Sequence, residues 1–470
     1  MQNTDKQMIL TWIEENKKSF EELALNIWKN PEIAHKEYEA VKLQKEFLEK
    51  QGFCITQKDG LPTAFMAEWR SEVPGGPVIG LLGEYDALGG LSQSVSAQVS
   101  PVTNGGPGHG CGHNLLGVGS LLAACAAKAI FVAQGLAGTI RYYGCPAEEV
   151  LTGKGAMAKL GYFDGTDVSL AWHPGDHSSV TNAIFTALGS AKFHFKGRAS
   201  HAGASPEGGR SALDAVELMN VGANYVREHM VDQDRLHYVI TSGGVAPNVV
   251  PADAEVWYYA RAPHDEELVS LWKRLVKVAK GAAMMTETEV TWEILGGCYN
   301  TLPNQRLNRA LEENLISFAG KADFDEEDLK FGQEIQATLD PRLVDTALTK
   351  TPLPEDEKVL NASPLPCFDH GTFIMGSTDV GDVAHIMPTS MMWCATWPLG
   401  VPNHTWQATA CAGSSIGLKG MKLAAKALAG CIYDLARDPS LLAEAREEFT
   451  RKRKGMPWQP VEDLLDKSAQ

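Results

Sequence analysis

The chain alternates between short apolar runs and longer stretches that carry apolar residues at helical spacing. The first 50 residues show the helical spacing, and Pro31 predicts a break between two amphipathic helices, because proline is tolerated at a helix start but not inside it. Later apolar runs are short and uninterrupted, which is typical of buried strands. The predicted strands are residues 77–82, 138–143 and 168–172, and the predicted helices start at residue 115 and cover 153–160. This alternation predicts an α/β fold, with a mixed, mostly parallel sheet covered by helices on both faces.

The pattern changes at about residue 186, where strands begin to alternate like half-exposed ones. The predicted elements are a strand at 190–196, a helix at 210–230, strands at 237–240 and 254–260, a helix at 266–284 and a strand at 289–294. This β-α-β-β-α-β order is typical of a ferredoxin-like α+β unit. We therefore expect a small domain inserted into the larger one.

A chain of 470 residues is too long for one ordinary core, so we expect two domains. The predicted boundaries place the first part of the larger domain at 1–185, the inserted domain at 186–299 and the second part of the larger domain at 300–470. Residues 300–365 are charged and are expected to be irregular. Residues 369–435 return to glycine-rich turns and an apolar helix, which would complete the larger domain.

Charge and cysteine usage narrow the class of protein. A net charge of −16 argues against a nucleic-acid or anionic-membrane partner, because either would need a concentrated basic face. The nine scattered cysteines form no disulfide framework, and the polar N-terminus lacks a signal-peptide pattern, so we expect a cytoplasmic protein. The longest apolar stretch, residues 115–134, contains Lys128 and is expected to be a buried helix, not a membrane span.

The run GHGCGHN at residues 108–114 is the most informative chemical feature. It places Cys111 and His113 two residues apart in a glycine-rich turn, which leaves room for an ion. Thiolate and imidazole ligands suit zinc or a similar divalent metal. A Cys-x-His pair alone is more often a buried cysteine and a capping histidine. Other ligand types at predicted strand ends favour the metal site, in which Cys111 could bridge two ions.

The adjacent acids Glu148 and Glu149 follow a predicted strand and a proline. Adjacent glutamates are usually a solvated helix start, but these two lie at the carboxyl end of a strand, where ligands bind in open α/β sheets. They would point in different directions, so we assign Glu149 as a metal ligand and Glu148 as the general base. A carboxylate beside a metal-bound water can take its proton and later deliver it to a leaving amine.

Three further residues complete the predicted site in the larger domain. His173 directly follows a predicted strand, and a turn histidine before Pro174 is the alternative to a ligand. His404, within PNHTW, is the last candidate ligand. Asp86 also follows a strand, and we expect it to accept the far N–H of a histidine ligand and thereby orient the ring.

Two features of the inserted domain are candidates for substrate contact. His201 lies in a loop of small residues, SHAGA, after a strand. Asn248, within PNVVP, precedes Arg261 in the next predicted strand, and the planar guanidinium of arginine suits a carboxylate, to which asparagine can add a donor. An arginine in a surface ion pair and an asparagine in a turn are the alternative.

Taken together, these motifs resemble the amidohydrolase branch of the aminoacylase/carboxypeptidase metallopeptidases. The resemblance rests on GHGCGHN, PAEE, AWHP, SHAGASP, PNVVP with its following arginine, NHTW, GRSALDA and STDVGD, and it extends over nearly the whole chain. It implies a zinc-peptidase-like catalytic domain and an inserted lid, through which two subunits form a homodimer. A homologous second subunit is the alternative partner.

The resemblance also implies a two-metal site that holds zinc or manganese. The implied ligands are Cys111, His113, Glu149, His173 and His404. Glu148 would be the base, and His201 would reach the partner subunit's active site and stabilise the oxyanion. The implied substrate-binding residues are Asn248, Arg261 and Arg210.

The function that we expect is metal-dependent cleavage of the amide bond of an N-acyl or N-aroyl amino acid, with p-aminobenzoyl-glutamate as the expected substrate. One alternative is a dipeptidase of the same fold that acts, for example, on β-alanyl dipeptides. Another is a subunit that binds amides but needs a homologous partner for turnover. Two positions depart from the family pattern: Asn114 replaces an aspartate, and residues 87–90 lack the usual proline.

Overall fold

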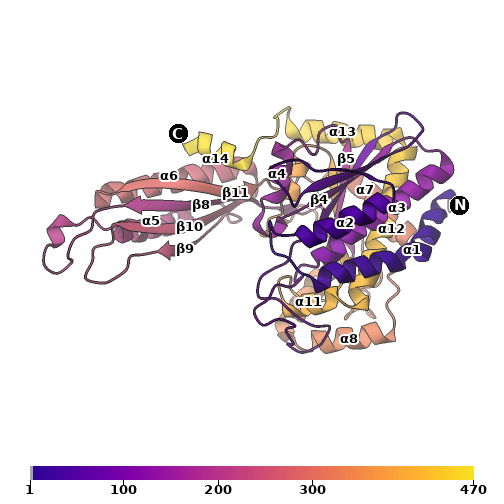
Figure 1. The fold of residues 1–470 in the computed structure, drawn as a ribbon, viewed down its shortest axis with the longest axis horizontal. Coiled ribbons are helices and arrows are strands. Elements are labelled where there is room, and N and C mark those ends of the chain that lie inside the picture. Colours follow the sequence, from indigo (N-terminus) through magenta and orange to yellow (C-terminus); the bar gives the residue numbers. More distant parts are fainter. Residues whose placement is uncertain (1–3, 470) are drawn as a thin grey trace. The chain divides into compact units, whose positions relative to one another are not determined.

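A computed structural model describes residues 4–469, which fall into two compact units. The large unit contains the chain up to Ala183 together with Leu302–Thr372 and Val383–Pro457. The small unit contains Ile184–Thr301, Phe373–Asp382 and the segment that begins at Trp458. The small unit therefore includes two segments that follow residue 300. Figure 1 labels many of the elements of both units.

The large unit is built on a seven-stranded sheet with the order β1-β2-β4-β3-β5-β13-β6. Its strands are β1 (Cys54–Thr56), β2 (Phe65–Arg70), β3 (Val78–Glu84), β4 (Thr139–Cys145), β5 (Val168–Gly175), β6 (Ser179–Val180) and β13 (Thr389–Ala395). The four central strands, β4, β3, β5 and β13, run parallel to one another, whereas β1, β2 and β6 pair antiparallel at the two edges. The predicted mixed sheet with a parallel centre is confirmed.

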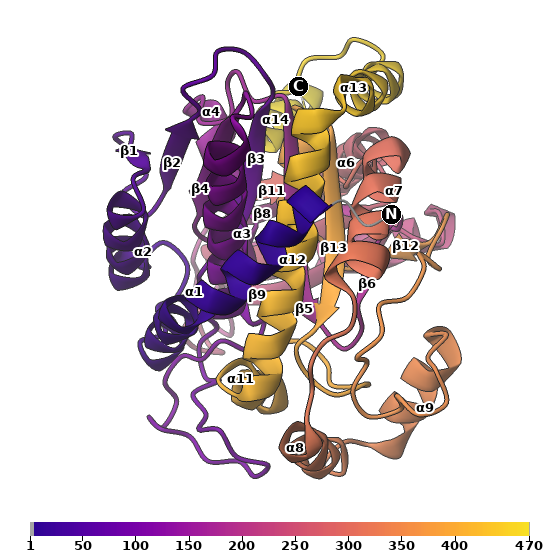
Figure 2. The same cartoon turned by 90° about the vertical axis from the view of Figure 1, so that its right-hand side faces the viewer.

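Helices α3 (His113–Gln134) and α12 (Ser415–Arg437) pack against this sheet, and α1 (Thr4–Lys29) lies across both of them (Figure 2). Helix α3 is long and apolar enough to cross a membrane, but 83% of its most apolar window is buried in the large unit. Gly119 allows the close approach, because a Cβ atom there would lie 2.7 Å from the Trp172 ring. The apolar sequence of α3 is therefore that of a core helix, as predicted.

Other elements of the large unit surround this core. Among them are α2 (Tyr38–Lys50), η1 (Glu148–Val150), α4 (Gly153–Lys159), α11 (Trp406–Ala412) and α13 (Pro439–Arg453). Helix α10 (Val380–Ala384) contains the boundary at which the chain passes from the small unit back to the large one.

The expectation that residues 300–365 are irregular was wrong. They form α7 (Gln305–Glu313), a π-helical turn η4 (Asn314–Ala319), α8 (Glu326–Gln336) and α9 (Pro341–Lys350). Each of the three α-helices begins at an Asn or Asp whose side chain accepts hydrogen bonds from the first-turn backbone: Asn304, Asp325 and Asp340. Such caps offset the cost of leaving N–H groups unpaired. They also mark helix starts in the sequence, but the many charged residues of this segment favoured an irregular structure in the prediction.

The small unit has the predicted ferredoxin-like order. Its main elements are β8 (Ala187–Lys196), α5 (Ala212–Val226), β9 (Arg235–Ser242), β10 (Asp253–Ala262), α6 (Asp265–Thr286) and β11 (Glu289–Cys298). The sheet order is β11-β8-β10-β9 and all pairs are antiparallel. The smaller elements are β7 (Ile184–Phe185), η2 (Pro206–Gly208), η3 (Arg227–His229), β12 (Phe373–Ile374) and α14 (Val461–Ala469). Phe193, Trp272 and Leu275 are among the residues that form its core.

Candidate active site

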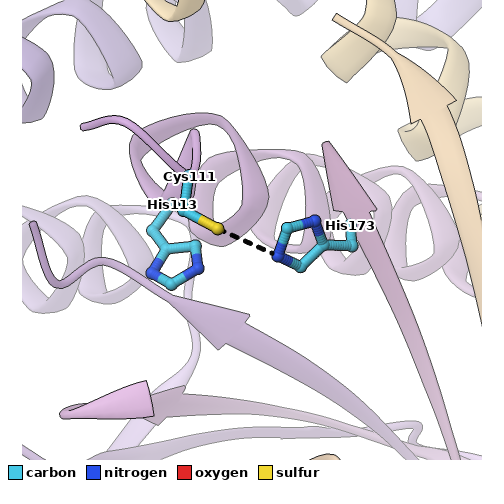
Figure 3. Close-up of side chains that lie close together, drawn as sticks. All are labelled: Cys111, His113 and His173. Carbon is cyan, nitrogen blue, oxygen red and sulfur yellow. Dashed lines mark hydrogen bonds between the residues drawn. The ribbon is translucent and has the colours of Figure 1, made fainter. Parts of the chain in front are cut away.

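The glycine-rich loop before α3 brings a thiol against an imidazole. Gly112 adopts a left-handed conformation (φ 70°), and a Cβ atom there would lie 2.9 Å from Pro174. A glycine is therefore required where the loop packs against the end of β5. The Sγ atom of Cys111 lies 3.4 Å from Nε2 of His173 (Figure 3).

His113 opens α3 and is fully buried beside two acids of β3 and its following turn. Its Nδ1 atom lies 2.8 Å from Oδ1 of Asp86. The other Asp86 oxygen accepts a hydrogen bond of 2.9 Å from the backbone N–H of Glu149. Asp86 therefore joins the histidine loop to the turn that carries the glutamates, and it leaves Nε2 of His113 facing the cluster without a hydrogen-bond partner.

The two glutamates lie on a tight turn after β4. Ala147 and Leu151 enclose η1 and both adopt left-handed backbone conformations, with φ values of 55° and 57°. Glu148 is buried, and its Oε2 lies 4.0 Å from Nε2 of His113. The side chain of Glu149 points elsewhere, with Oε2 3.1 Å from Nε2 of His404. The two carboxylates therefore lie against different histidines and point in different directions.

His404 reaches the site on a left-handed turn (φ 63°) before α11. Its backbone N–H donates to the carbonyl of Gly110 at 2.8 Å, which joins this late segment to the glycine-rich loop. Its side chain is half exposed, unlike those of Cys111 and His113. The neighbouring Asn403 amide lies 3.6 Å from Sγ of Cys111.

The five predicted ligands are brought together in two overlapping groups. Cys111, His113 and His173 form one, and Cys111, Glu149 and His404 form the other, with the donor atoms of each group within 4.8 Å of one another. Buried donor atoms without hydrogen-bond partners lie at the cluster, namely Nε2 of His113 and Oε1 of Glu149. A partly buried set of nitrogen, sulfur and oxygen donors with unsatisfied members fits divalent cations.

Glu84 and Lys154 are buried at the site, and sequence reasoning did not single them out. One Glu84 oxygen lies 2.6 Å from Nζ of Lys154, and the other lies 3.3 Å from Nε2 of His113. Burial raises the pKa of Glu84, but the Lys154 ammonium and His113 more than offset this and hold it below its ordinary value. Glu84 could have been predicted as a site residue because it is the last residue of β3, whereas nothing in the sequence pattern of α4 indicated that Lys154 is buried at the site.

Burial also shifts the pKa values of the proposed ligands. Burial raises the pKa of the Cys111 thiol, and the Glu149 carboxylate adds to the rise. Burial together with His113 lowers the pKa of His173 to about 4. Burial would lower the pKa of His113, but Cys111 and Asp86 raise it well above its ordinary value. A divalent cation among these donors would favour the thiolate and the neutral imidazoles, which are the forms that bind metals.

In the small unit, the loops of His201 and Asn248 lie side by side. The backbone carbonyl of Asn248 accepts a hydrogen bond of 2.9 Å from Ala202, and both candidate side chains are exposed. Nδ1 of His201 accepts from the backbone N–H groups of Gly203 and Ala204, at 3.2 and 3.0 Å. A neutral His201 therefore carries its proton on Nε2, where it is a hydrogen-bond donor.

The two arginines of the small unit have different surroundings. Arg261 is half-buried and donates to the Ser377 hydroxyl at 2.7 Å, and it forms no ion pair within the described part of the chain. Arg210 forms an ion pair of 2.8 Å with Glu287 and donates to the backbone carbonyls of Glu207 and Gly209. The guanidinium of Arg261 therefore lacks an anionic partner among residues 4–469, whereas that of Arg210 has one.

Comparison with known proteins bears on the site's chemistry. A family model described as the peptidase dimerisation domain matches residues 186–284. The chain is 40% identical to a subunit of the p-aminobenzoyl-glutamate hydrolase of Escherichia coli, with 95% of each chain covered. It is 32% identical to the Xaa-Arg dipeptidase of Mus musculus, with 92% of this chain and 88% of that one covered. A dinuclear metal-binding peptidase of the M20 family from Bacillus subtilis shares the fold, with a TM-score of 0.52, 17% identity and coverage of 87% and 98%.

Proposed function

Because the chain belongs to the M20 family of metallopeptidases and amidohydrolases, we propose that it cleaves the amide bond of an N-acyl or N-aroyl amino acid. The proposed substrate is p-aminobenzoyl-glutamate, and the products are p-aminobenzoate and glutamate. One observation carries the proposal: a partly buried cluster of thiol, imidazole and carboxylate donors lies in a chain that is 40% identical to a protein named for hydrolysis of this substrate.

The proposed cofactors are two divalent ions per subunit, zinc or manganese. Cys111, His113 and His173 would hold one ion, and Cys111, Glu149 and His404 would hold the other. When bound, such ions make water a stronger acid and polarise a carbonyl oxygen. Nε2 of His113 and Oε1 of Glu149 support this assignment, because both are buried without a hydrogen-bond partner, although Nε2 of His113 lies 3.3 Å from a Glu84 oxygen.

Glu148 is the proposed general base. It would take a proton from the attacking water and deliver it to the nitrogen of the leaving amino acid, so that the amide carbon gains the water oxygen as the C–N bond breaks. Its burial and its position 4.0 Å from Nε2 of His113 support this role. Asp86 would hold His113 in the tautomer that leaves Nε2 available for metal.

His201 is the proposed donor to the oxyanion, which it would reach from the partner subunit of a homodimer. Its Nε2–H is presented outward because Nδ1 accepts two backbone N–H groups. Asn248, Arg261 and Arg210 are the proposed contacts of the substrate carboxylate. The half-buried guanidinium of Arg261, which has no anionic partner among the described residues, is the best supported of the three.

The small unit is the proposed lid and dimer contact. Its edge strand β9 is largely exposed, with Val239 and Ile240 at 53% and 40% of full exposure. An exposed edge strand offers unpaired backbone groups to a second chain. A homologous second subunit is the alternative partner, because the Escherichia coli hydrolase has two named subunits and both are similar to this chain. We propose a cytoplasmic location.

A dipeptidase activity is the second candidate function. The similarity to a mouse Xaa-Arg dipeptidase favours it, and both reactions would use the same proposed metal ligands and base. The difference would lie in recognition of the acyl group, for which an aroyl group and an aminoacyl group place different charges near the scissile bond.

A substrate panel tests the proposal. Metal-loaded protein is assayed with p-aminobenzoyl-glutamate, benzoyl-glutamate, acetyl-glutamate, a β-alanyl dipeptide and an Xaa-Arg dipeptide. We expect kcat/KM to be highest for p-aminobenzoyl-glutamate. A preference for either dipeptide would establish the dipeptidase instead, and no hydrolysis of any substrate by the metal-loaded homomer would favour the subunit that needs a partner.

A further inference from the structure

The connector between α1 and α2, residues 30–37, lies against the turn that carries Glu148 and Glu149. We propose that Glu37, on this connector, is a positioning residue for the reaction. Its carboxyl group fixes the backbone of the glutamate turn and thereby the direction of the Glu148 side chain. The proposal rests on the proposed role of Glu148 as the base.

The glutamate turn needs support from outside itself. Ala147 and Leu151, at its two ends, both have left-handed backbone conformations that residues other than glycine rarely adopt. Its backbone hydrogen bonds include those from Leu151 to the Glu148 carbonyl and from Thr152 to the Ala147 carbonyl, at 2.7 and 3.4 Å. Strained turns of this kind persist where surrounding groups hold them.

Glu37 supplies a hydrogen bond at the strained start of the turn. Its Oε1 atom accepts from the backbone N–H of Ala147 at 2.8 Å and from that of His35 at 2.9 Å. The side chain has no solvent exposure, and Oε2 is buried without a hydrogen-bond partner. A buried carboxyl oxygen without a hydrogen-bond partner destabilises the folded state. The two hydrogen bonds that the other oxygen accepts explain why a glutamate is buried at this position.

Two further side chains hold the rest of the turn. Nε2 of His35, on the same connector, lies 2.8 Å from Oγ1 of Thr152 at the end of the turn. Asp86 accepts from the N–H of Glu149 in its middle. Glu148 therefore lies between two backbone N–H groups, those of Ala147 and Glu149, that buried carboxyl groups hold in place.

Three variants of one residue separate the position of the hydrogen-bond acceptor from the presence of a carboxyl group. Glu37→Gln keeps an acceptor oxygen at the same reach, whereas Glu37→Asp keeps the carboxyl group but withdraws the acceptor by one methylene. Glu37→Ala removes both. We expect Glu37→Gln to keep kcat within about threefold, whereas Glu37→Ala and Glu37→Asp lower kcat by about 10–100-fold, because small misplacements of a catalytic group cost about this much. KM and metal content should remain near those of the wild type.

Glu32→Ala is the matched control on the same connector. The Glu32 carboxylate accepts from the backbone N–H groups of Glu39 and Ala40 and so caps α2. Its loss should lower the melting temperature without a change in kcat, because these hydrogen bonds hold α2 and not the glutamate turn. The melting temperature of each variant is measured beside kcat, KM and bound metal.

Several results would overturn the proposal. One is an unchanged kcat in Glu37→Asp and Glu37→Ala. Another is a loss of kcat in Glu37→Gln as large as that in Glu37→Ala. The third is a loss of kcat in Glu32→Ala as large as that in Glu37→Ala. If Glu37→Ala does not fold, the contrast between the Gln and Asp variants decides. Glu148→Gln distinguishes this failure from failure of the proposed function. Full turnover by that variant would show that Glu148 is not the base, whatever the role of Glu37.

Discussion

The candidate residues of the two units differ in how they are held. In the large unit, Cys111 and His113 are buried, and Asp86 joins His113 to the backbone of Glu149. In the small unit, His201 and Asn248 are exposed on loops held mainly by backbone hydrogen bonds. The large unit thus contains a preorganised cluster, whereas the small unit presents exposed side chains, although Nδ1 of His201 already accepts two backbone hydrogen bonds.

The largest effect should come from Glu148. Glu148→Gln keeps the size of the side chain but cannot accept the proton, so we expect kcat to fall by about 10²–10⁴-fold. Metal bound per subunit, measured by elemental analysis of the same samples, should be unchanged, because Glu148 is not among the proposed ligands. Full turnover by this variant would contradict the assignment of the base.

Loss of His201 should have the next largest effect, although it is exposed. His201→Ala should lower kcat by about 10²–10³-fold if its Nε2–H stabilises the oxyanion, with metal content and melting temperature unchanged. His194→Ala is the control, because His194 is a partly exposed histidine of the small unit and pairs with Glu255. Equal rates for the two variants would show that His201 has no part in catalysis.

Substitution of Asp86 tests whether the metal ligands depend on the carboxylate that contacts both His113 and the backbone N–H of Glu149. Asp86→Ala should weaken metal binding by about 10–100-fold, since residues that orient metal ligands typically contribute this much. Competition with a chelator measures the affinity. An affinity equal to that of the wild type would mean that His113 and the Glu149 turn are held without Asp86.

A pH effect on stability should be the smallest, and it belongs to the small unit. Burial, with Asp379 and Glu462 adding to it, raises the pKa of Asp382 from 3.8 to about 8 against a hydrogen bond from Trp458. The folded state therefore keeps a proton that the unfolded state releases, so the stability contributed by Asp382 is lost as the pH rises from about 4 to 8. Asp382→Asn should raise the melting temperature by about 5 °C at pH 8 and hardly at pH 4. A difference in melting temperature between Asp382→Asn and the wild type that does not change with pH would contradict the raised pKa of Asp382.

Much of the site could be predicted from where strands end. Asp86, Glu148 and His173 each follow an apolar run, and parallel strands bring such positions to one edge of the sheet. The ferredoxin-like order of the small unit could also be predicted, because its strands and helices have clear periodicity. Strands β2 and β13 were missed, since their sequences, FMAEWR and TSMMWCA, lack strict alternation and are poor in β-branched residues.

The contacts that hold the site could not be predicted. The bond from Ala147 to Glu37 joins residues 110 positions apart, and it depends on a left-handed turn that alanine does not signal. The same holds for Lys154, whose burial beside Glu84 follows from how α4 packs and not from its sequence. Sequence patterns locate side chains on elements, whereas these contacts depend on how distant segments pack.

The central claim is that the cluster of the large unit binds metal and uses it to hydrolyse an amide. Its most direct test is to strip the protein of metal, titrate it with manganese or zinc, and follow bound metal and p-aminobenzoate release in the same samples. We predict that release is absent before metal is added and rises with up to two ions per subunit, and that Cys111→Ser loses both properties together. Full turnover by metal-free protein, or unchanged metal binding and turnover in Cys111→Ser, would contradict the account.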